Sequence, residues 1–360
     1  MGGAVEGAVG GVMGKLLETF SYLHSYGPVL VISLLASAVL TPICGWYARR
    51  RGIVDHPGEA KIHKHATPLL GGVAIYVAFL VAVALTRDYS NELKGVVAAG
   101  SIVFILGLMD DAKGLPASLR LFGQFVAAGI LVDYGIVVKF IPNHLLAALV
   151  TAVGVVGVTN ATNFLDNMDG LAAGLVAIAS ATFFLIGYRT DQHWLCFLAI
   201  AMCGATCGFL VHNAWPARIF MGDSGSTFIG FVMASLAVMG EWSSDAIVAA
   251  TIPSIVVSIF LFDTILITVL RIKEGKVRSL RQWIEHRDTD HVSHRLVAAG
   301  STRSGAVIII YLAAAALGVM AWTTSVLGRP AAVASIVTIL ASGLAAGWWL
   351  DRVGPLGKSA

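Results

Sequence analysis

The sequence contains few charged residues. Lys, Arg, Asp and Glu make up 12% of its 360 residues, whereas an average soluble domain has about 25% charged residues. Long polar stretches that could fold as a separate domain are also missing between Val29 and Leu350. This composition excludes an ordinary soluble protein and predicts a single membrane domain over residues 27–360.

Cysteine is scarce as well. None of the four cysteines forms a CxxC pair or lies beside a histidine at ligand spacing, so we interpret them as small buried helix residues. Residues 1–26 lack the basic start and apolar run of a cleaved signal. We expect this segment to form a short helix, amphipathic or frayed, ahead of the membrane domain.

Hydrophobic runs, in contrast, are abundant. Apolar stretches long enough to cross a bilayer, about 20 residues each, recur along the chain, and we predict an all-α polytopic membrane helix bundle of about 10–11 transmembrane helices. Eleven spans are centred near Leu35, Val77, Val103, Val126, Val153, Ile178, Ala201, Met233, Ser258, Leu312 and Ile339.

The basic residues are unevenly distributed between the loops. With the N-terminus outside, the inner segments hold eighteen Lys and Arg residues and the outer segments hold six. Basic residues concentrate on the cytoplasmic side of membrane proteins, so this predicts an outside N-terminus. It also explains the net charge of +3 without nucleic-acid binding. Small-residue spacings such as Gly204 to Gly208 favour helix packing and leave a homodimer open.

Acidic residues lie at the ends of two predicted spans. Asp110 and Asp111 close the third span, where a divalent cation or a shared proton would relieve their repulsion.

Asn160, Asn163, Asp166 and Asp169 recur every three residues at the end of the fifth span, so on a helix they would form one polar stripe. The alternative for Asp110 and Asp111 is a simple helix end at the membrane interface, and the alternative for the polar stripe is a polar packing seam between helices.

A third acidic position opens the eighth span. Glycines on both sides of Asp223 allow a ligand to approach the backbone closely, and the following residues would offer free N–H groups to an anion. Asp223 could hold a metal ion, or it could simply cap the helix.

Basic and histidine residues complete the set. We interpret His291, His294 and Arg295 as donors to a substrate phosphate or sugar, because Mg²⁺ prefers oxygen ligands. A basic loop that contacts anionic lipid is the alternative. Lys61, Lys64 and Arg120 are additional candidates for substrate contact, because they lie on the same predicted side.

All of these clusters fall on the predicted cytoplasmic face. This one-sidedness favours an interfacial active site for a soluble anionic donor and a lipid acceptor. A transporter of an anionic substrate would place polar residues near the midplane. An intramembrane prenyltransferase, which also binds a polyprenyl phosphate, would show NDxxDxxxD-like spacing. Both remain alternatives.

The order of these motifs resembles the polyprenyl-phosphate N-acetylhexosamine-1-phosphate transferases, from about Asp55 to Arg295. The acidic pair resembles that family's DD motif, the stretch from Asn163 to Gly170 its NxxDGxDGL motif, and the stretch from Asn213 to Gly225 its NxxPAxxFMGDxG motif. The resemblance implies ten or eleven spans, a cytoplasmic site in the bacterial inner membrane, and a requirement for Mg²⁺, with Mn²⁺ as a substitute. It implies a UDP-sugar donor, most simply UDP-GlcNAc, and a polyprenyl phosphate acceptor.

Residue roles follow from the same resemblance. It implies that Asp223 and Asn163 hold Mg²⁺ and that Asp110 and Asp111 handle the acceptor phosphate, with Asp110 as the base. Arg120 would bind a phosphate. The uridine or diphosphate would contact Asp166, Asp169 and Asn213. Together these roles predict two adjoining pockets, one for nucleotide and metal and one for the sugar phosphate around His291.

The sequence departs from the family pattern in three places. Asn167 replaces the usual Gly, and Ser293 stands where GlcNAc-type relatives often have a third histidine. The His-rich, Glu-ended loop and the GTPTMGG sequence of the pentapeptide translocases are missing. Because that loop sets sugar preference in the family, its absence disfavours a peptide-bearing donor.

Overall fold

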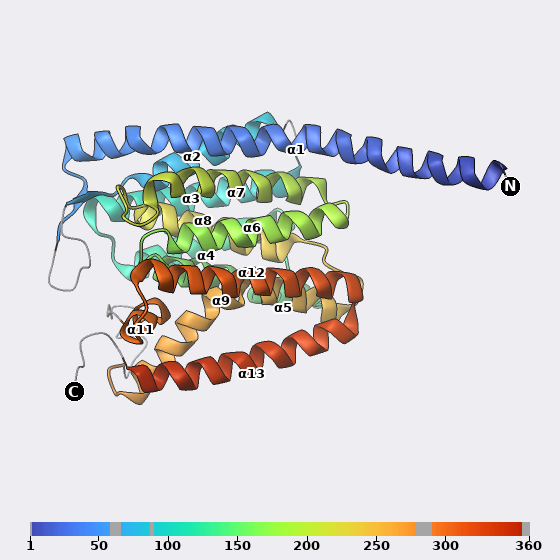
Figure 1. Ribbon diagram of the computed structural model, residues 1–360. Helices are drawn as coiled ribbons and strands as arrows, with labels where there is room; N and C mark the ends of the chain where they lie inside the picture. Colours follow the sequence, from blue (N-terminus) through green and yellow to red (C-terminus); the bar gives the residue numbers. More distant parts are fainter. Residues whose placement is uncertain (1, 58–65, 87–89, 278–289, 355–360) are drawn as a thin grey trace.

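Long helices account for most of the chain. The computed structural model describes residues 2–57, 66–86, 90–277 and 290–354, with the backbone alone for residues 2–24. The long helices run side by side in one bundle (Figure 1). They are α1 (Gly2–Arg51), α2 (Gly71–Leu85), α3 (Asn91–Lys113), α4 (Ala117–Asp133), α5 (His144–Leu165), α6 (Leu171–Arg189), α7 (His193–Asn213), α8 (Gly222–Met239), α9 (Ala246–Lys273), α12 (Arg303–Leu327) and α13 (Arg329–Val353).

The predicted membrane bundle is confirmed. Each of the eleven predicted span centres falls inside one of these helices. Within the described ranges, nine helices are long and apolar enough to cross a membrane. Helices α2 and α4 have 15 and 17 residues, fewer than the about 20 that a full crossing needs. The chain is therefore a multi-pass membrane protein whose two shortest helices lie beside full-length ones.

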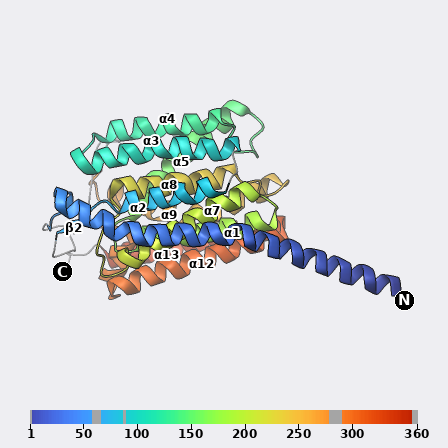
Figure 2. The same ribbon diagram turned by 90° about the horizontal axis from the view of Figure 1, so that it is seen from above.

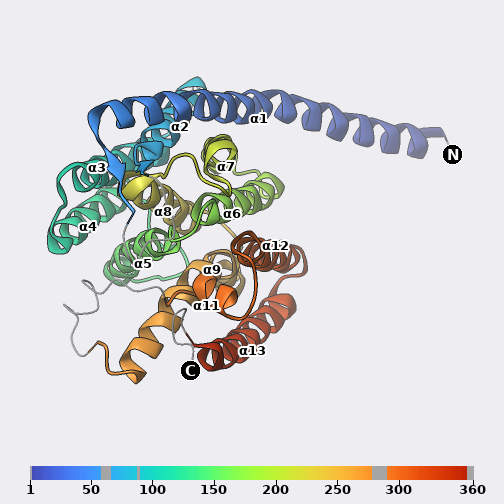
Figure 3. The same cartoon turned by 60° about the vertical axis from the view of Figure 1, so that its left-hand side comes forward.

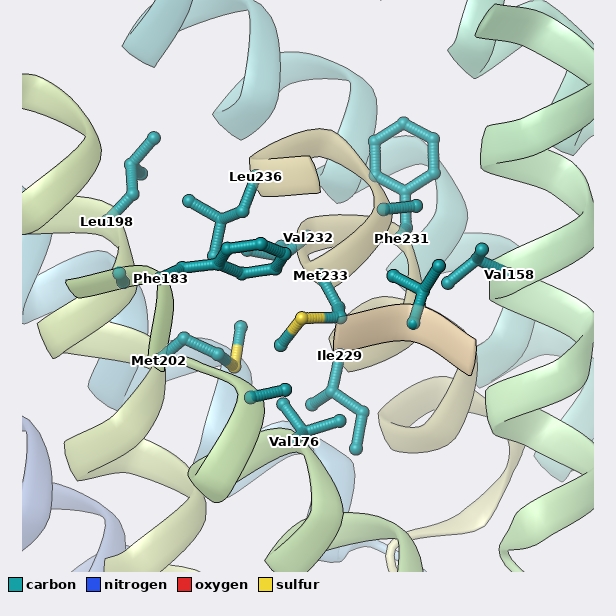
Figure 4. Packing of buried hydrophobic residues seen from close by; sticks show 14 of the residues in the cluster. Val158, Val176, Phe183, Leu198, Met202, Ile229, Phe231, Val232, Met233 and Leu236 are labelled. Carbon is teal, nitrogen blue, oxygen red and sulfur yellow. The ribbon is translucent and has the colours of Figure 1, made fainter. Parts of the chain in front are cut away.

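Helix α8 forms the centre of the bundle. In its apolar window 83% of the residues are buried, compared with 11% in α13 at the edge. Ile229, Met233 and Leu236 of α8 pack against side chains of neighbouring helices, including Phe183 and Val176 of α6 (Figure 4). Because close packing surrounds α8, the residues at its N-terminal end are held in fixed positions.

The first helix is longer than its span. Helix α1 runs without interruption from Gly2 to Arg51, and its first half extends beyond the rest of the bundle (Figures 1 and 2). The membrane span is its second part, from Ser25 to Arg51. The backbone of residues 2–26 is thus helical and continuous with the span, and its predicted amphipathic character stays a prediction.

The segment before α2 is fastened to the start of α8. Strands β1 (Val54–Asp55) and β2 (Thr67–Pro68) pair antiparallel, with Val54 opposite Pro68. Beyond them, the Gly72 N–H donates to the Met221 carbonyl at 2.9 Å. A Cβ on Gly72 would lie 2.3 Å from the Gly225 nitrogen. Only glycine permits this approach, which joins the first loop to the segment carrying Asp223.

Candidate active site

One cavity collects most of the predicted site residues. It has a volume of about 1110 Å³ and lies where α3, α5 and α7 end and α8 and α12 begin. Figure 3 turns this end of the bundle forward, with the short helix α11 (Val292–Ala298) beside α9 and α12. The predicted residues that line it are Asp110, Asp111, Asn163, Asp166, Asp169, Asn213, Asp223, His291 and His294.

The prediction of two adjoining pockets was wrong, because the nucleotide–metal residues and the residues around His291 line one cavity. Lys61 and Lys64 lie outside the described residues.

Arg120 joins two of the acidic residues. Its Nη1 atom lies 2.6 Å from Asp110 Oδ2 and 3.1 Å from Asp223 Oδ2. The other Asp110 oxygen accepts the Leu115 N–H at 2.5 Å. Helices α3, α4 and α8 therefore bring one cation between two carboxylates that lie 113 positions apart in the sequence.

Asp111 caps α8 from a different helix. Its two carboxylate oxygens accept the N–H groups of Asp223 at 2.7 Å and Ser224 at 3.0 Å. The expectation that these N–H groups are free to bind an anion was wrong, because a carboxylate from α3 already occupies them. The capping alternative for Asp223 was wrong too, since α8 begins at Gly222 and its N-cap is Met221. A negative charge at a helix N-terminus is favourable.

The fifth helix ends earlier than the predicted polar stripe. Helix α5 ends at Leu165, so Asp166 is its C-cap and Asp169 lies in the following turn. The prediction of one helical stripe was therefore wrong. Asn160 exchanges hydrogen bonds with Gln124 of α4, whereas Asn163 donates to Asp223 Oδ1 at 2.8 Å.

Two of the residues expected to contact nucleotide hold the backbone around the cavity. Asn213 accepts the Gly170 N–H at 3.0 Å and donates to the Ile219 carbonyl at 2.9 Å. Asp169 accepts the Ala217 N–H at 2.9 Å. These bonds tie the turn after α5 to the loop before α8 and so fix the shape of the cavity wall.

The cavity carries an excess of negative charge. Six aspartates line it, namely Asp55, Asp110, Asp111, Asp166, Asp169 and Asp223. Burial raises the pKa of Asp166 to about 8, and the charges of Asp223 and Asp111 add to this rise. Among the described residues, no group of three or more His, Cys, Asp or Glu side chains stands ready to hold a metal ion. The charge excess and the oxygen donors nevertheless fit a hard divalent cation.

The two histidines have different surroundings. His291 Nδ1 lies 2.7 Å from Asp263 Oδ2 of α9. His294 Nδ1 is buried and has no hydrogen-bond partner among the residues that the structure describes. Burial, supported by the nearby His291, lowers the pKa of His294 to about 4, so its ring is neutral at physiological pH.

Arg295 does not line the cavity. Only 1% of the residue is exposed, and its guanidinium donates to the carbonyls of Asp290 at 2.9 Å and Leu350 at 3.0 Å. The Asp290 carboxylate binds Arg271 through two hydrogen bonds. In this arrangement Arg295 fastens α11 to the end of α13, which differs from the predicted donor to substrate.

Comparison with known proteins defines the family. The sequence profile described as glycosyl transferase family 4 matches residues 93–241. A probable undecaprenyl-phosphate N-acetylglucosaminyl 1-phosphate transferase of Bacillus subtilis is 32% identical over 292 residues, or 78% of this chain and 80% of the relative. The chain belongs to glycosyl transferase family 4.

Other members of the family are similar over much of their length. A decaprenyl-phosphate N-acetylglucosaminephosphotransferase of Mycolicibacterium smegmatis is 32% identical over 364 residues, covering 86% of this chain and 87% of the relative. A phospho-N-acetylmuramoyl-pentapeptide-transferase of Bacillus velezensis is 29% identical over 240 residues, covering 58% and 74%. The profile match contains Asp110, Asp223 and the residues between them but ends before α11.

Two departures from the family pattern contact each other. Ser293 Oγ donates to Asn167 Oδ1 at 2.6 Å, and the Asn167 amide donates to the Phe164 carbonyl at 2.7 Å. Asn167, which replaces a glycine after α5, is therefore hydrogen-bonded to Ser293, which stands in α11 where relatives often have a histidine. This bond links the two parts of the cavity wall.

Sequence reasoning missed two further residues. Asp263 is an isolated acid within the apolar run of α9, and its side chain is 2% exposed. The rule that ionisable residues at membrane depth mark function would have found it. Tyr311 of α12 lines the cavity and donates to the Gly170 carbonyl at 2.5 Å, and no pattern in the sequence indicates this contact.

Proposed function

We propose that this protein transfers N-acetylglucosamine 1-phosphate from UDP-GlcNAc to a polyprenyl phosphate and releases UMP. The relatives named for transferring this sugar phosphate support the proposal at 32% identity over most of the chain. The observation that carries it is the acidic cavity at one end of a membrane bundle, where Arg120 lies between Asp110 and Asp223. A lipid phosphate and a soluble nucleotide could both reach this end of the bundle.

A divalent cation is part of the proposal. The ionised aspartates of the cavity would repel the diphosphate of a nucleotide sugar unless a cation balanced their charge. Asp223 and the amide oxygen of Asn163 would hold Mg²⁺, and Mn²⁺ could substitute, because both cations accept oxygen ligands. When bound, the ion would neutralise the charge on the phosphate oxygens.

The residues then have distinct tasks in the displacement. Asp110 would orient the acceptor phosphate and take up its proton, so that an acceptor oxygen forms a bond to the β-phosphorus of the donor. The bond from that phosphorus to the bridging oxygen breaks, and UMP carries the bridging oxygen away. Arg120 would bind a phosphate between Asp110 and Asp223, so the protein contributes mainly positioning and charge.

The proposed location follows from charge and substrate. We place the cavity on the cytoplasmic face of a bacterial plasma membrane, because the basic loops predict that side and the nucleotide donor is soluble. The product, a polyprenyl-diphosphate-sugar, would start the synthesis of a cell-envelope polysaccharide.

The test is release of UMP by the purified full-length protein. Undecaprenyl phosphate, Mg²⁺ and a panel of UDP-sugars are supplied, and the expected result is release with UDP-GlcNAc that stops in EDTA. Reactions without lipid and with an Arg120→Ala variant are the controls. Absence of UMP for every sugar, together with substrate uptake into proteoliposomes, would reject the proposal in favour of a transporter.

A further inference from the structure

Asp263 places a buried carboxylate behind the cavity. It lies within α9, whose sequence around it is largely apolar, and its side chain is 2% exposed. Burying a carboxylate is strongly unfavourable unless it is paired and hydrogen-bonded. Such a residue therefore has a specific partner.

That partner is the beginning of α11. One Asp263 oxygen accepts the Val292 N–H at 2.7 Å, and the other lies 2.7 Å from His291 Nδ1. His291 is the N-cap of α11 and lines the cavity. Both carboxylate oxygens are thus directed at two consecutive residues, one through its backbone and one through its ring.

The contact with the ring determines how His291 meets the cavity. A carboxylate accepts hydrogen bonds and donates none, so Nδ1 must carry the proton. Nε2 is then the nitrogen left for a ligand, where it can accept a proton and later donate it. Within the described residues His294 Nδ1 has no partner, and burial keeps this ring neutral, so His294 offers no matching arrangement.

We propose that Asp263 is a positioning residue that fixes the tautomer and orientation of His291, so that Nε2 faces the phosphate or sugar of the substrate. This inference rests on the proposed function. Asp263 does not itself line the cavity, so its effect on the reaction passes through His291.

The decisive variant is Asp263→Asn, which has the same shape. Its amide oxygen can still accept the Val292 N–H, but its NH₂ group would face His291 Nδ1 and force the opposite tautomer. We expect kcat to fall about tenfold or more, as when a histidine is held in the wrong tautomer, with KM for the UDP-sugar little changed. Thr264→Val, on the adjacent position of α9, is the matched control and should keep wild-type kcat.

A double-mutant cycle separates positioning from general damage. In a His291→Ala background, Asp263→Asn should cause no further loss, and Asp263→Glu should retain more kcat than Asp263→Asn. An equal loss of kcat in both backgrounds, or a wild-type kcat for Asp263→Asn, would overturn the inference. If the wild-type protein released no UMP, the proposed function would fail instead, so the two failures are distinguishable.

Discussion

Two cavities of similar size lie at opposite ends of the described part of the bundle, and their linings differ in chemistry. The acidic cavity has a volume of about 1110 Å³, and a second cavity between α5, α8 and α9 has about 1020 Å³. Helix α8 contributes to both, with Asp223 and Ser226 at one end and Ala234 and Ala237 at the other. The second cavity is mainly apolar, and the ion pair of Lys139 and Glu241 lies at its edge.

This difference indicates where chemistry can occur. Space alone does not distinguish the two ends, since the volumes are nearly equal. At the acidic end, by contrast, carboxylates from α3 and α8 meet a cation from α4 and an amide from α5. Four helices fix the relative positions of these charges, which is the preorganisation that phosphoryl transfer needs.

The largest expected effect comes from removing charges at the acidic end. Asp110→Asn, Asp111→Asn and Asp223→Asn should each lower UMP release about 10²- to 10³-fold, because each removes a fixed charge or a cap that holds Asp223. Glu241→Gln, which removes a carboxylate at the apolar cavity, is the matched control and should remain active. Near-normal rates in all three Asn variants would contradict the assignment of the site.

Two glycines provide the next comparison. Gly222 has φ +71°, and an added Cβ would lie 2.6 Å from Asp111 Oδ2. Gly222→Ala should therefore displace Asp111, reduce UMP release by tenfold or more, and cost about 1–3 kcal/mol in backbone strain. At Gly154, within α5 beside the apolar cavity, an added Cβ meets nothing within 4 Å, so Gly154→Ala should leave UMP release unchanged and should not lower the thermal stability. Equal losses for both variants would show that the two ends do not differ.

A smaller effect should appear in the pH dependence of stability. Because the pKa of Asp166 is raised to about 8, the folded protein favours the neutral carboxyl. The Asp166 carboxyl therefore contributes to the free energy of unfolding, fully below its ordinary pKa near 3.8. That contribution is lost as the pH rises through 8. In EDTA, we expect Tm to fall between pH 5 and 9, with a flatter profile for Asp166→Asn. Mg²⁺ should restore Tm at high pH, and identical profiles for variant and wild type would reject this account.

The smallest effect concerns the hydrogen bond between Ser293 and Asn167, which joins two parts of the acidic cavity wall. Ser293→Ala removes a hydrogen bond worth about 0.5–1.5 kcal/mol, so KM for the UDP-sugar should rise by a few fold. Asn167→Ala should do the same, and the double variant should be no worse than either single variant. Ser258→Ala, on the membrane-buried part of α9, serves as the control. Fully additive losses would mean that the two residues act separately.

Most of the fold was predictable from the sequence. Span centres such as Leu35 and Met233 lie within helices because a bilayer leaves a helix as the main way to satisfy the backbone of an apolar run. The Asp110 and Asp223 motifs also marked the site, because charges beside apolar runs are costly without a use.

Individual contacts could not be predicted in the same way. Asp111 caps α8 and Arg295 fastens α11 to α13, although the sequence suggested a ligand role for both. The contact between Asp263 and His291 was not predictable either, because the two residues lie 28 positions apart in the sequence.

By itself, then, the sequence determined the membrane helices and the motifs at their ends, since hydrophobicity and local spacing are properties of short segments. Tertiary structure alone decided which polar atoms meet. Whether Asp111 binds an anion or caps α8, and whether Arg295 faces substrate or the Leu350 carbonyl, depends on helices that become neighbours only when the bundle packs.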